Sequence, residues 1–267
     1  MRTMSVGAIG GGLLPEQWGL PYETIEMETP FGRPSAPVAR TQLADGKMLH
    51  SILRHGKGHD VGSAINYRAN VAALHQLGCD LVVSLCLAGT LVDRFDVGDV
   101  VVFDDVLDFR KSSCSFYAPT EAVHCAMAPL VSSALLDQLA GISATVGCAF
   151  RATMVVIEGP RYSTHAETRM YANLGGDLVC QTIAPECFLV REKQMDWFGV
   201  CLVTDRDTRD PGALVNTGVI YENMNRHKDR YVATLLRIFE GLNPFDRLEA
   251  MVQHAVPRSR LTESRDD

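Results

Sequence analysis

Two nearly unbroken apolar runs, at residues 80–89 and 197–203, constrain the fold most strongly. Each has the length of a strand, and a strand without polar alternation must be buried on both faces, as in a sheet covered by helices. Between residues 66 and 77, just before the first run, apolar residues recur at helical spacing, and Gly78 is a suitable C-cap. This order of strand, helix and strand predicts an α/β fold.

The composition favours one domain that binds a small molecule. A chain of 267 residues with 46% hydrophobic and 21% charged residues is long enough for one large α/β domain. Its formal net charge of -7 offers no electrostatic footprint for nucleic acid or an anionic membrane. Residues 1–12 lack the layout of a signal peptide and no apolar run has the length of a membrane helix, so we expect a cytoplasmic protein.

The eight cysteines give no sign of a metal or disulfide framework. They are spread along the chain without a C-x-x-C pair, and most lie within apolar runs. This distribution is typical of reduced thiols in a core. We therefore expect no structural metal.

Two carboxylates, Asp205 and Asp207, directly follow the second apolar run. They emerge at the carboxyl end of a strand, where open α/β sheets bind their ligands. In an extended chain both would point the same way and could accept from a ring N–H and an exocyclic amine, as on an aminopurine. The alternative is a solvated acidic turn with Arg206 as counter-charge, and this stretch alone leaves both interpretations open.

Two further segments are suited to an anion or a sugar. A predicted strand at 49–53 delivers a basic, glycine-spaced turn from Arg54 to His59, whose donors could bind an anion. A short apolar strand near the N-terminus ends in Gly10, Gly11 and Gly12, which allow backbone amides to approach a phosphate or sugar closely. The contiguous glycines do not match the dinucleotide-binding fingerprint.

Several motifs occur together and in order along the chain. They are Arg54-His55-Gly56, His59, Asn66-Tyr67, Ala69-Asn70, the strand ending Ala88-Gly89-Thr90-Leu91, the segment 154–163 with Ala166-Glu167, Gln181 to Glu186, and Thr204 to Asp207. With these motifs the chain resembles the trimeric purine nucleoside phosphorylase and methylthioadenosine phosphorylase family from Ile9 to about Phe239. The resemblance implies a single α/β domain over residues 1–245, with a central mixed, partly barrel-like sheet flanked by helices, and a homotrimer. Residues 246–267 would form a C-terminal tail whose end is poorly ordered.

The resemblance also implies roles for individual residues. Asp205 would be the catalytic general acid near N7 of the base and Asp207 the partner of its 6-amino group. The other implied contacts are Tyr162 and Ser163 against the base, His59, Gln181, His124 and Tyr221 on the ribose and 5′ side, and Arg54, His55, Thr182, Gly12 and Cys86 around phosphate. For Tyr162 a role as a core aromatic and for His124 a role as an ordinary surface histidine remain open. Glu158, Glu167 and Glu186 are expected to fix loops.

Two departures from the family concern phosphate. Gly12 and Cys86 stand where the family has hydroxyl side chains, and each lost hydrogen bond to a charged group costs roughly 1.5 to 3 kcal/mol. A third difference concerns the pocket for the 5′ substituent. The start of the last helix, where the family has small aliphatic residues, contains Gly218, Tyr221 and Glu222. We therefore expect a weak phosphate site and tolerance of a polar 5′ group.

The implied function is phosphorolysis of 5′-methylthioadenosine, or a related 5′-modified adenosine, to adenine and a sugar 1-phosphate. The reaction needs no cofactor besides inorganic phosphate as co-substrate. One alternative is a nucleosidase that uses water, and another is a catalytically weak adenosine-binding relative. Phosphate dependence separates the first two functions, and any turnover excludes the third.

Overall fold

The computed structural model describes residues 4–11, 18–58, 61–117, 123–207, 215–245 and 252–254. They form an eleven-stranded mixed sheet, five α-helices and a separate two-stranded sheet. The strands of the large sheet are β1 (Ser5–Gly10), β2 (Glu23–Ile25), β3 (Val38–Gln42), β4 (Met48–Leu53), β5 (Leu81–Thr90), β6 (Val100–Phe103), β7 (Asp105–Asp108), β9 (Ala149–Phe150), β10 (Thr153–Val156), β11 (Leu178–Cys180) and β12 (Asp196–Asp205).

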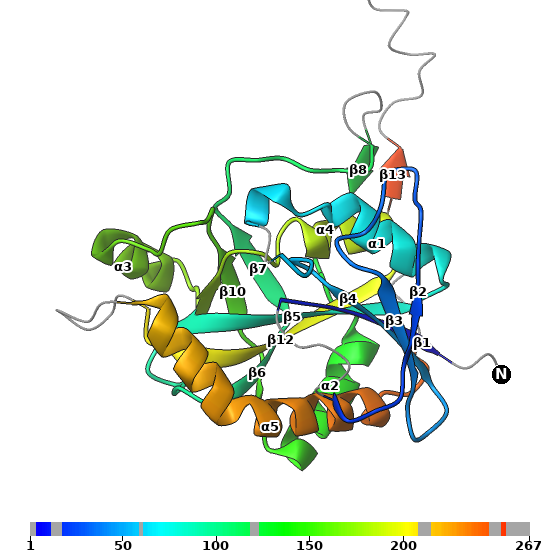
Figure 1. The fold of residues 1–267 in the computed structure, drawn as a ribbon. Coiled ribbons are helices and arrows are strands. Elements are labelled where there is room, and N and C mark those ends of the chain that lie inside the picture. The colour runs from blue at the N-terminus through cyan, green and yellow to red at the C-terminus, as the bar shows by residue number, and fades with distance from the viewer. Residues whose placement is uncertain are drawn as a thin grey trace, which may run out of the picture.

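The helices cover both sides of the central strands (Figure 1). On one side α5 packs on β12 and against α2, and on the other side α1 packs against α4. A 3-10 turn covers Gly62–Ala64. The α-helices are α1 (Tyr67–Gln76), α2 (Ser133–Val146), α3 (His165–Asn173), α4 (Glu186–Glu192) and α5 (Thr217–Gly241).

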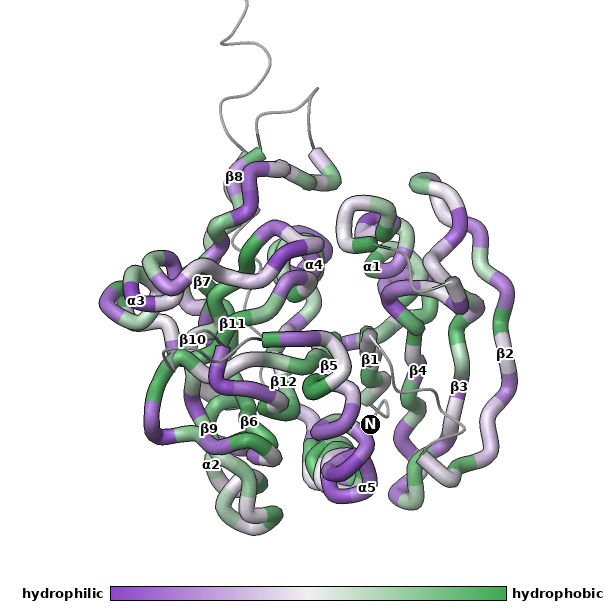
Figure 2. The backbone as a smooth tube through the Cα atoms, turned by 60° about the vertical axis from the view of Figure 1, so that its left-hand side comes forward, coloured by the Kyte–Doolittle hydropathy of each residue, from purple (hydrophilic) through white to green (hydrophobic). Residues whose placement is uncertain are grey.

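The two apolar runs form β5 and β12, which lie side by side in parallel at the centre of the sheet. Every residue of β12 from Asp196 to Thr204 is buried, and the central strands are largely green in the hydropathy view of Figure 2. This burial on both faces confirms the prediction from their composition. The helix expected at 66–77 is α1, whose N-cap Asn66 accepts from the backbone N–H of Ala69.

A fork in the sheet at β5 creates the space for a site. Along one edge of β5, β1 pairs in parallel as far as Leu85, while β11 pairs antiparallel only from Gly89 onward. The opposite edge is occupied by β12 along almost the whole strand. Since β1 and β11 leave β5 in different directions, residues 86–88 have no ladder partner on the first edge among the described residues.

Apolar residues at helical spacing predict two further helices, at 130–139 and at 216–241, and the second would have Met224, Tyr231, Leu235 and Ile238 on its inner face. The helix expected at 216–241 is α5, capped by the Asn216 side chain at the N–H of Val219. The helix expected at 130–139 was misplaced: α2 begins only at Ser133, because the Ser132 hydroxyl accepts from the N–H of Leu135, and it continues to Val146.

The C-terminal segment expected as a tail contains a strand. Val252–His254 form β13, which pairs antiparallel with β8 (Val123–Cys125). The charged end at 258–267 lies outside the described residues. All eight cysteines are free thiols and five of them are buried, as expected of core thiols. No helix in the described part of the chain is long and apolar enough to cross a bilayer.

Candidate active site

A cavity of about 390 Å³ lies at the fork of the sheet. Its walls come from the ends of β1 and β11, from residues 85–89 of β5, from the end of β12 and from one face of α5. This volume is in the range that suits a small-molecule ligand. The sequence assigned base, ribose or phosphate contacts to eleven described residues, and all of them except His124 line the cavity: Arg54, His55, Cys86, Tyr162, Ser163, Gln181, Thr182, Asp205, Asp207 and Tyr221.

Three predicted site residues are not among those described as lining this cavity. His124 is exposed on β8, and it is not among the residues that line the cavity in its own chain. Gly12 and His59 lie outside the described residues. The structure therefore brings together all the described residues that were assigned to the base and to phosphate.

The carboxylate pair Asp205 and Asp207 occupies one end of the cavity, but not in the extended conformation expected. The register of β12 against β5 shifts between Val203 and Asp205, and Asp207 has a left-handed φ of 42°. The chain turns so that the N–H of Asp207 donates to Oδ2 of Asp205 at 3.0 Å. Both carboxylates still face the cavity, because the turn, and not strand alternation, orients Asp207.

Neighbouring hydroxyls hold both carboxylates. The Thr204 hydroxyl donates to Oδ1 of Asp205 at 2.9 Å, and the Thr168 hydroxyl of α3 donates to Oδ2 of Asp207. Burial raises the pKa of Asp205 above its ordinary value, although the hydrogen bonds from the Thr204 hydroxyl and the Asp207 N–H lower it. A carboxyl with a raised pKa is suited to hold or deliver a proton in a cavity.

Tyr162 and Ser163 form the adjoining wall. The Tyr162 hydroxyl and the Thr217 hydroxyl of α5 lie 3.0 Å apart, which connects this wall to the helix. The Ser163 hydroxyl is buried and has no hydrogen-bond partner among the described residues. A buried hydroxyl without a partner costs about 1 to 3 kcal/mol, so this position favours a ligand or water that bonds to it.

The two carboxylates pack closely against β5 at Gly89, which has no side chain. A Cβ atom at this position would be 2.7 Å from Oδ2 of Asp205 and 3.2 Å from Cβ of Asp207. These distances are shorter than van der Waals contact allows, so the close packing of the carboxylates on β5 requires glycine.

We predict that Gly89→Ala lowers kcat/KM for the best nucleoside by about a hundredfold, because a catalytic group misplaced by about 1 Å costs a factor of this order. Steady-state kinetics would measure it. The control is Gly141→Ala on α2, where an added Cβ would meet no atom within 4 Å. Equal kinetics for Gly89→Ala and the wild-type protein would contradict the assignment of Asp205 and Asp207 to the site.

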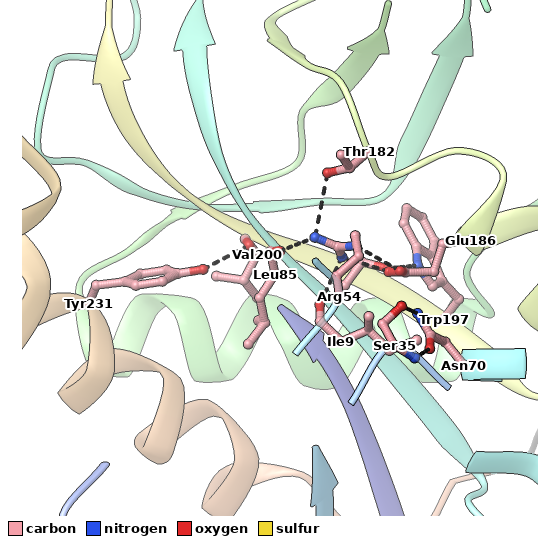
Figure 3. Close-up of polar contacts among 11 residues, drawn as sticks. Ile9, Ser35, Arg54, Asn70, Leu85, Thr182, Glu186, Trp197, Val200 and Tyr231 are labelled. Carbon is pink, nitrogen blue, oxygen red and sulfur yellow. Dashed lines mark hydrogen bonds and ion pairs between the residues drawn. The ribbon is translucent and has the colours of Figure 1, made fainter. Parts of the chain in front are cut away.

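The other end of the cavity contains Arg54, which is completely buried and whose hydrogen bonds are drawn in Figure 3. Its Nε and Nη2 donate to the two oxygens of Glu186, each at 2.8 Å, and Nη2 also donates to the Ile9 carbonyl. Its Nη1 donates to the Leu85 carbonyl at 2.9 Å and, at a longer 3.5 Å, to the Thr182 hydroxyl. Four of the five N–H groups are thus firmly engaged, and only the one toward Thr182 is weakly held.

Glu186 neutralises the charge that the sequence assigned to phosphate. Burial disfavours the guanidinium, but the Glu186 carboxylate outweighs it and keeps the pKa of Arg54 above its ordinary value. The Ser84 hydroxyl donates to the same carboxylate at 2.5 Å, and Trp197 Nε1 donates to Ser84 at 2.9 Å. Arg54 therefore belongs to a buried network, and it can offer an anion in the cavity little uncompensated charge.

His55, Cys86 and Thr182 complete this end. The His55 ring lies over Gly11, where an added Cβ would be 3.3 Å from Cδ2 of the ring. Burial raises the pKa of the Cys86 thiol well above its ordinary value, so it stays neutral and is at most a weak donor. The cavity thus has a polar but weakly charged phosphate end.

The sugar side contains Gln181 and Tyr221. Gln181 Nε2 donates to the Arg161 carbonyl at 3.1 Å, which fixes the amide on the loop before Tyr162. Tyr221 lines the cavity from α5 and remains 40% exposed. The expectation for its neighbours was wrong: Gly218 and Glu222 do not line the cavity, because they lie on another face of α5, where Glu222 pairs with Arg226 at 2.8 Å.

The three glutamates expected to fix loops do so. Glu158 accepts from the N–H of Lys111 and from the Ser112 hydroxyl. Glu167 closes a capping box with Thr164 at the start of α3 and pairs with Arg161. Glu186 holds Arg54, as described above.

Part of the α5 wall was not assigned to the site from the sequence. Thr217, Ile220, Met224, Lys228 and Tyr231 also line the cavity. Their spacing of three or four residues is that of one helix face, and the pattern predicted Met224 and Tyr231 on that face. The same spacing includes Lys228, which is four residues after Met224 and three before Tyr231.

Residues 9–240 match the model of the phosphorylase superfamily. The chain belongs to this superfamily. It is an enzyme of the purine nucleoside phosphorylase type, a pentosyltransferase. The superfamily match covers both ends of the cavity, from the strand that precedes Gly11 to the helix that contains Lys228.

Individual relatives agree with this membership. The chain is 36% identical over 258 residues to S-methyl-5′-thioadenosine phosphorylase of Mycolicibacterium smegmatis, covering 96% of both chains. It is 35% identical over 210 residues to the protein of that name from Pyrococcus horikoshii, covering 76% of this chain and 79% of the relative. Methylthioadenosine phosphorylase from Schistosoma mansoni, solved with adenine, superposes with a TM-score of 0.82 at 26% identity, over 90% of this chain and 93% of that one.

Proposed function

We propose that this enzyme catalyses phosphorolysis of 5′-methylthioadenosine, or a related 5′-modified adenosine, to adenine and a sugar 1-phosphate. The observation that carries the proposal is the arrangement of one cavity, with Asp205 and Asp207 at one end and Arg54, His55 and Thr182 at the other. A nucleoside between them would present its base to the carboxylates and its anomeric carbon to an anion bound at the far end.

The carboxylate pair supports adenine over a 6-oxopurine. Asp207 is an acceptor fixed by Thr168, which suits a 6-amino donor, and Asp205 has the raised pKa that a proton donor to N7 requires. Protonation at N7 would stabilise the departing base, on which negative charge develops as the glycosidic bond breaks. Relatives named for methylthioadenosine or solved with adenine support the same substrate class.

A panel of nucleosides tests this proposal. We expect adenine release from 5′-methylthioadenosine and adenosine, and at least a hundredfold lower kcat/KM for inosine. A preference for inosine would contradict the base assignment. Absence of turnover with every nucleoside would favour the weak adenosine-binding relative.

The 5′ wall gives a sharper prediction. Tyr221 lines the cavity together with the apolar residues Ile220 and Met224 of α5. We predict that Tyr221→Phe, which removes only this hydroxyl, raises the ratio of kcat/KM for 5′-methylthioadenosine over adenosine by about three- to tenfold, because one hydrogen bond is worth about 0.5 to 1.5 kcal/mol. An unchanged ratio would show that the 5′ group does not contact Tyr221.

The proposal includes a homotrimer in which His124 reaches the 5′ end of a neighbouring subunit's cavity. In its own chain His124 is exposed and outside the cavity, which leaves it accessible to a second copy. A mass measurement in solution tests the trimer. A monomer that is fully active at the concentrations of the assay would contradict it.

A further inference from the structure

The phosphate end of the cavity lacks the charge that a phosphate dianion needs. Arg54 is paired with Glu186, and Asp205 and Asp207 add two carboxylates to the same cavity. Among the described lysines and arginines, only Arg54 and Lys228 line this cavity. The Lys228 ammonium makes no hydrogen bond or ion pair with any residue that the structure describes.

The contacts of Asn223 and Tyr231 show how α5 runs along the cavity, and the position of Lys228 on the helix places its backbone closer to the Arg54 end. Nδ2 of Asn223 donates to the Thr204 carbonyl beside Asp205, whereas the Tyr231 hydroxyl donates to the Val200 carbonyl at 3.1 Å. Val200 pairs with Leu85, and the Leu85 carbonyl accepts from Arg54, as Figure 3 shows. Lys228 lies three residues before Tyr231, which is about 4.5 Å along the helix axis. It is therefore closer than Asn223 to the part of the cavity that contains Leu85 and Arg54.

We propose that Lys228 binds the phosphate co-substrate and supplies the uncompensated positive charge of the phosphate site. This inference rests on the proposed phosphorolysis and names a binding residue for its nucleophile. The ammonium would take over the role of the hydroxyls that are absent at Gly12 and Cys86. A lysine is a compact point charge with three donors, so it can hold phosphate without the fixed geometry of a hydroxyl pair.

The same cation could instead bind an anionic 5′ substituent of the nucleoside. The nearness of Tyr231 to Leu85 and Arg54 favours phosphate as the ligand. The 5′ group is expected at the other end of the helix, where Thr217 and Tyr221 line the cavity near Tyr162. The two ligands make different kinetic predictions, since phosphate and nucleoside can be varied independently.

Lys228→Met keeps the apolar stem of the side chain and removes its charge. At constant ionic strength we expect the KM for phosphate to rise roughly tenfold to a hundredfold, with the KM for 5′-methylthioadenosine changed less than about threefold. Lys228→Arg should remain within about threefold of wild-type phosphate KM. The matched control is Arg230→Met, which removes a charge from an exposed position of the same helix outside the cavity.

Equilibrium binding separates failure of this inference from failure of the proposed function. Titration calorimetry with inorganic phosphate needs no turnover, and we expect wild-type protein and Arg230→Met to bind phosphate at least tenfold more tightly than Lys228→Met. If this difference appeared without phosphate-dependent adenine release, Lys228 would stand and phosphorolysis would fail. An unchanged phosphate affinity in Lys228→Met, no phosphate binding by wild-type protein, or an effect confined to nucleosides with a 5′ carboxylate or phosphate would overturn the inference.

Discussion

Asp205→Asn is expected to lower kcat/KM for adenine nucleosides by about a hundredfold to ten-thousandfold, the range that general acid catalysis typically contributes. The amide cannot deliver a proton to N7 of the leaving base, but it preserves the shape of the side chain. The Thr204 hydroxyl, which donates to Oδ1, can turn to accept from the amide, so the local structure should survive. Kinetics with adenosine-type and inosine-type substrates would measure the loss and any shift in preference.

Asp137→Asn on the exposed face of α2 is the matched control, and its kinetics should equal those of the wild-type protein. A variant at Asp205 that kept wild-type kcat/KM on the best adenine nucleoside would show that the base site is wrongly assigned.

The raised pKa of Asp205 also predicts how stability depends on pH. Burial raises the pKa of Asp205 in the folded state above its unfolded-state value of about 3.9. The protonated carboxyl therefore contributes its full stability below pH 3.9, and this contribution is lost as the pH rises through the folded-state pKa. Asp205→Asn remains neutral throughout. Its unfolding free energy relative to wild type should therefore increase from pH 4 to pH 7, and a constant difference would contradict the raised pKa.

Glu186→Gln is expected to have the largest effect on stability, a loss of about 3 to 5 kcal/mol in the free energy of unfolding. The variant leaves the Arg54 charge fully buried without a counter-charge, which is costly in a low-dielectric interior. Chemical denaturation, followed by the fluorescence of the buried Trp197, would measure it. The control is Glu222→Gln, which breaks an exposed pair with Arg226 and should cost less than about 1 kcal/mol.

A double variant tests the reason for this loss. Arg54→Met with Glu186→Leu removes both charges, so its unfolding free energy should exceed that of Glu186→Gln, although its activity should be low. If the double variant were less stable than Glu186→Gln, the loss would come from packing and not from an unpaired charge.

The sequence predicted the framework of the site because local patterns determine it. Uninterrupted runs of apolar residues predicted β5 and β12 as central strands, and the position of Asp205 directly after the second run placed a carboxylate at the strand end. Helical spacing likewise predicted α5 and the positions of Met224 and Tyr231 on its inner face.

The remaining features depend on contacts between distant segments, which no local pattern records. The basic turn after β4 predicted a positive charge that could bind an anion. Arg54 is instead neutralised by Glu186, 132 residues away, so its charge is not available to an anion in the cavity. The left-handed turn at Asp207 is stabilised by a hydrogen bond from Thr168 of α3. No hydrophobic periodicity in the sequence predicts this contact between α3 and the end of β12. Lys228 had a local signal in its helical spacing, but only the cavity shows that this face of α5 is part of the site.

The identity of the nucleophile is the central claim, and product analysis tests it most directly. The enzyme would be incubated with 5′-methylthioadenosine with and without inorganic phosphate, with adenine measured by absorbance and phosphorus species by ³¹P NMR. We predict one sugar 1-phosphate for each adenine released, and no adenine release when phosphate is omitted. Adenine release at the same rate without phosphate, together with free sugar, would contradict phosphorolysis and identify a nucleosidase.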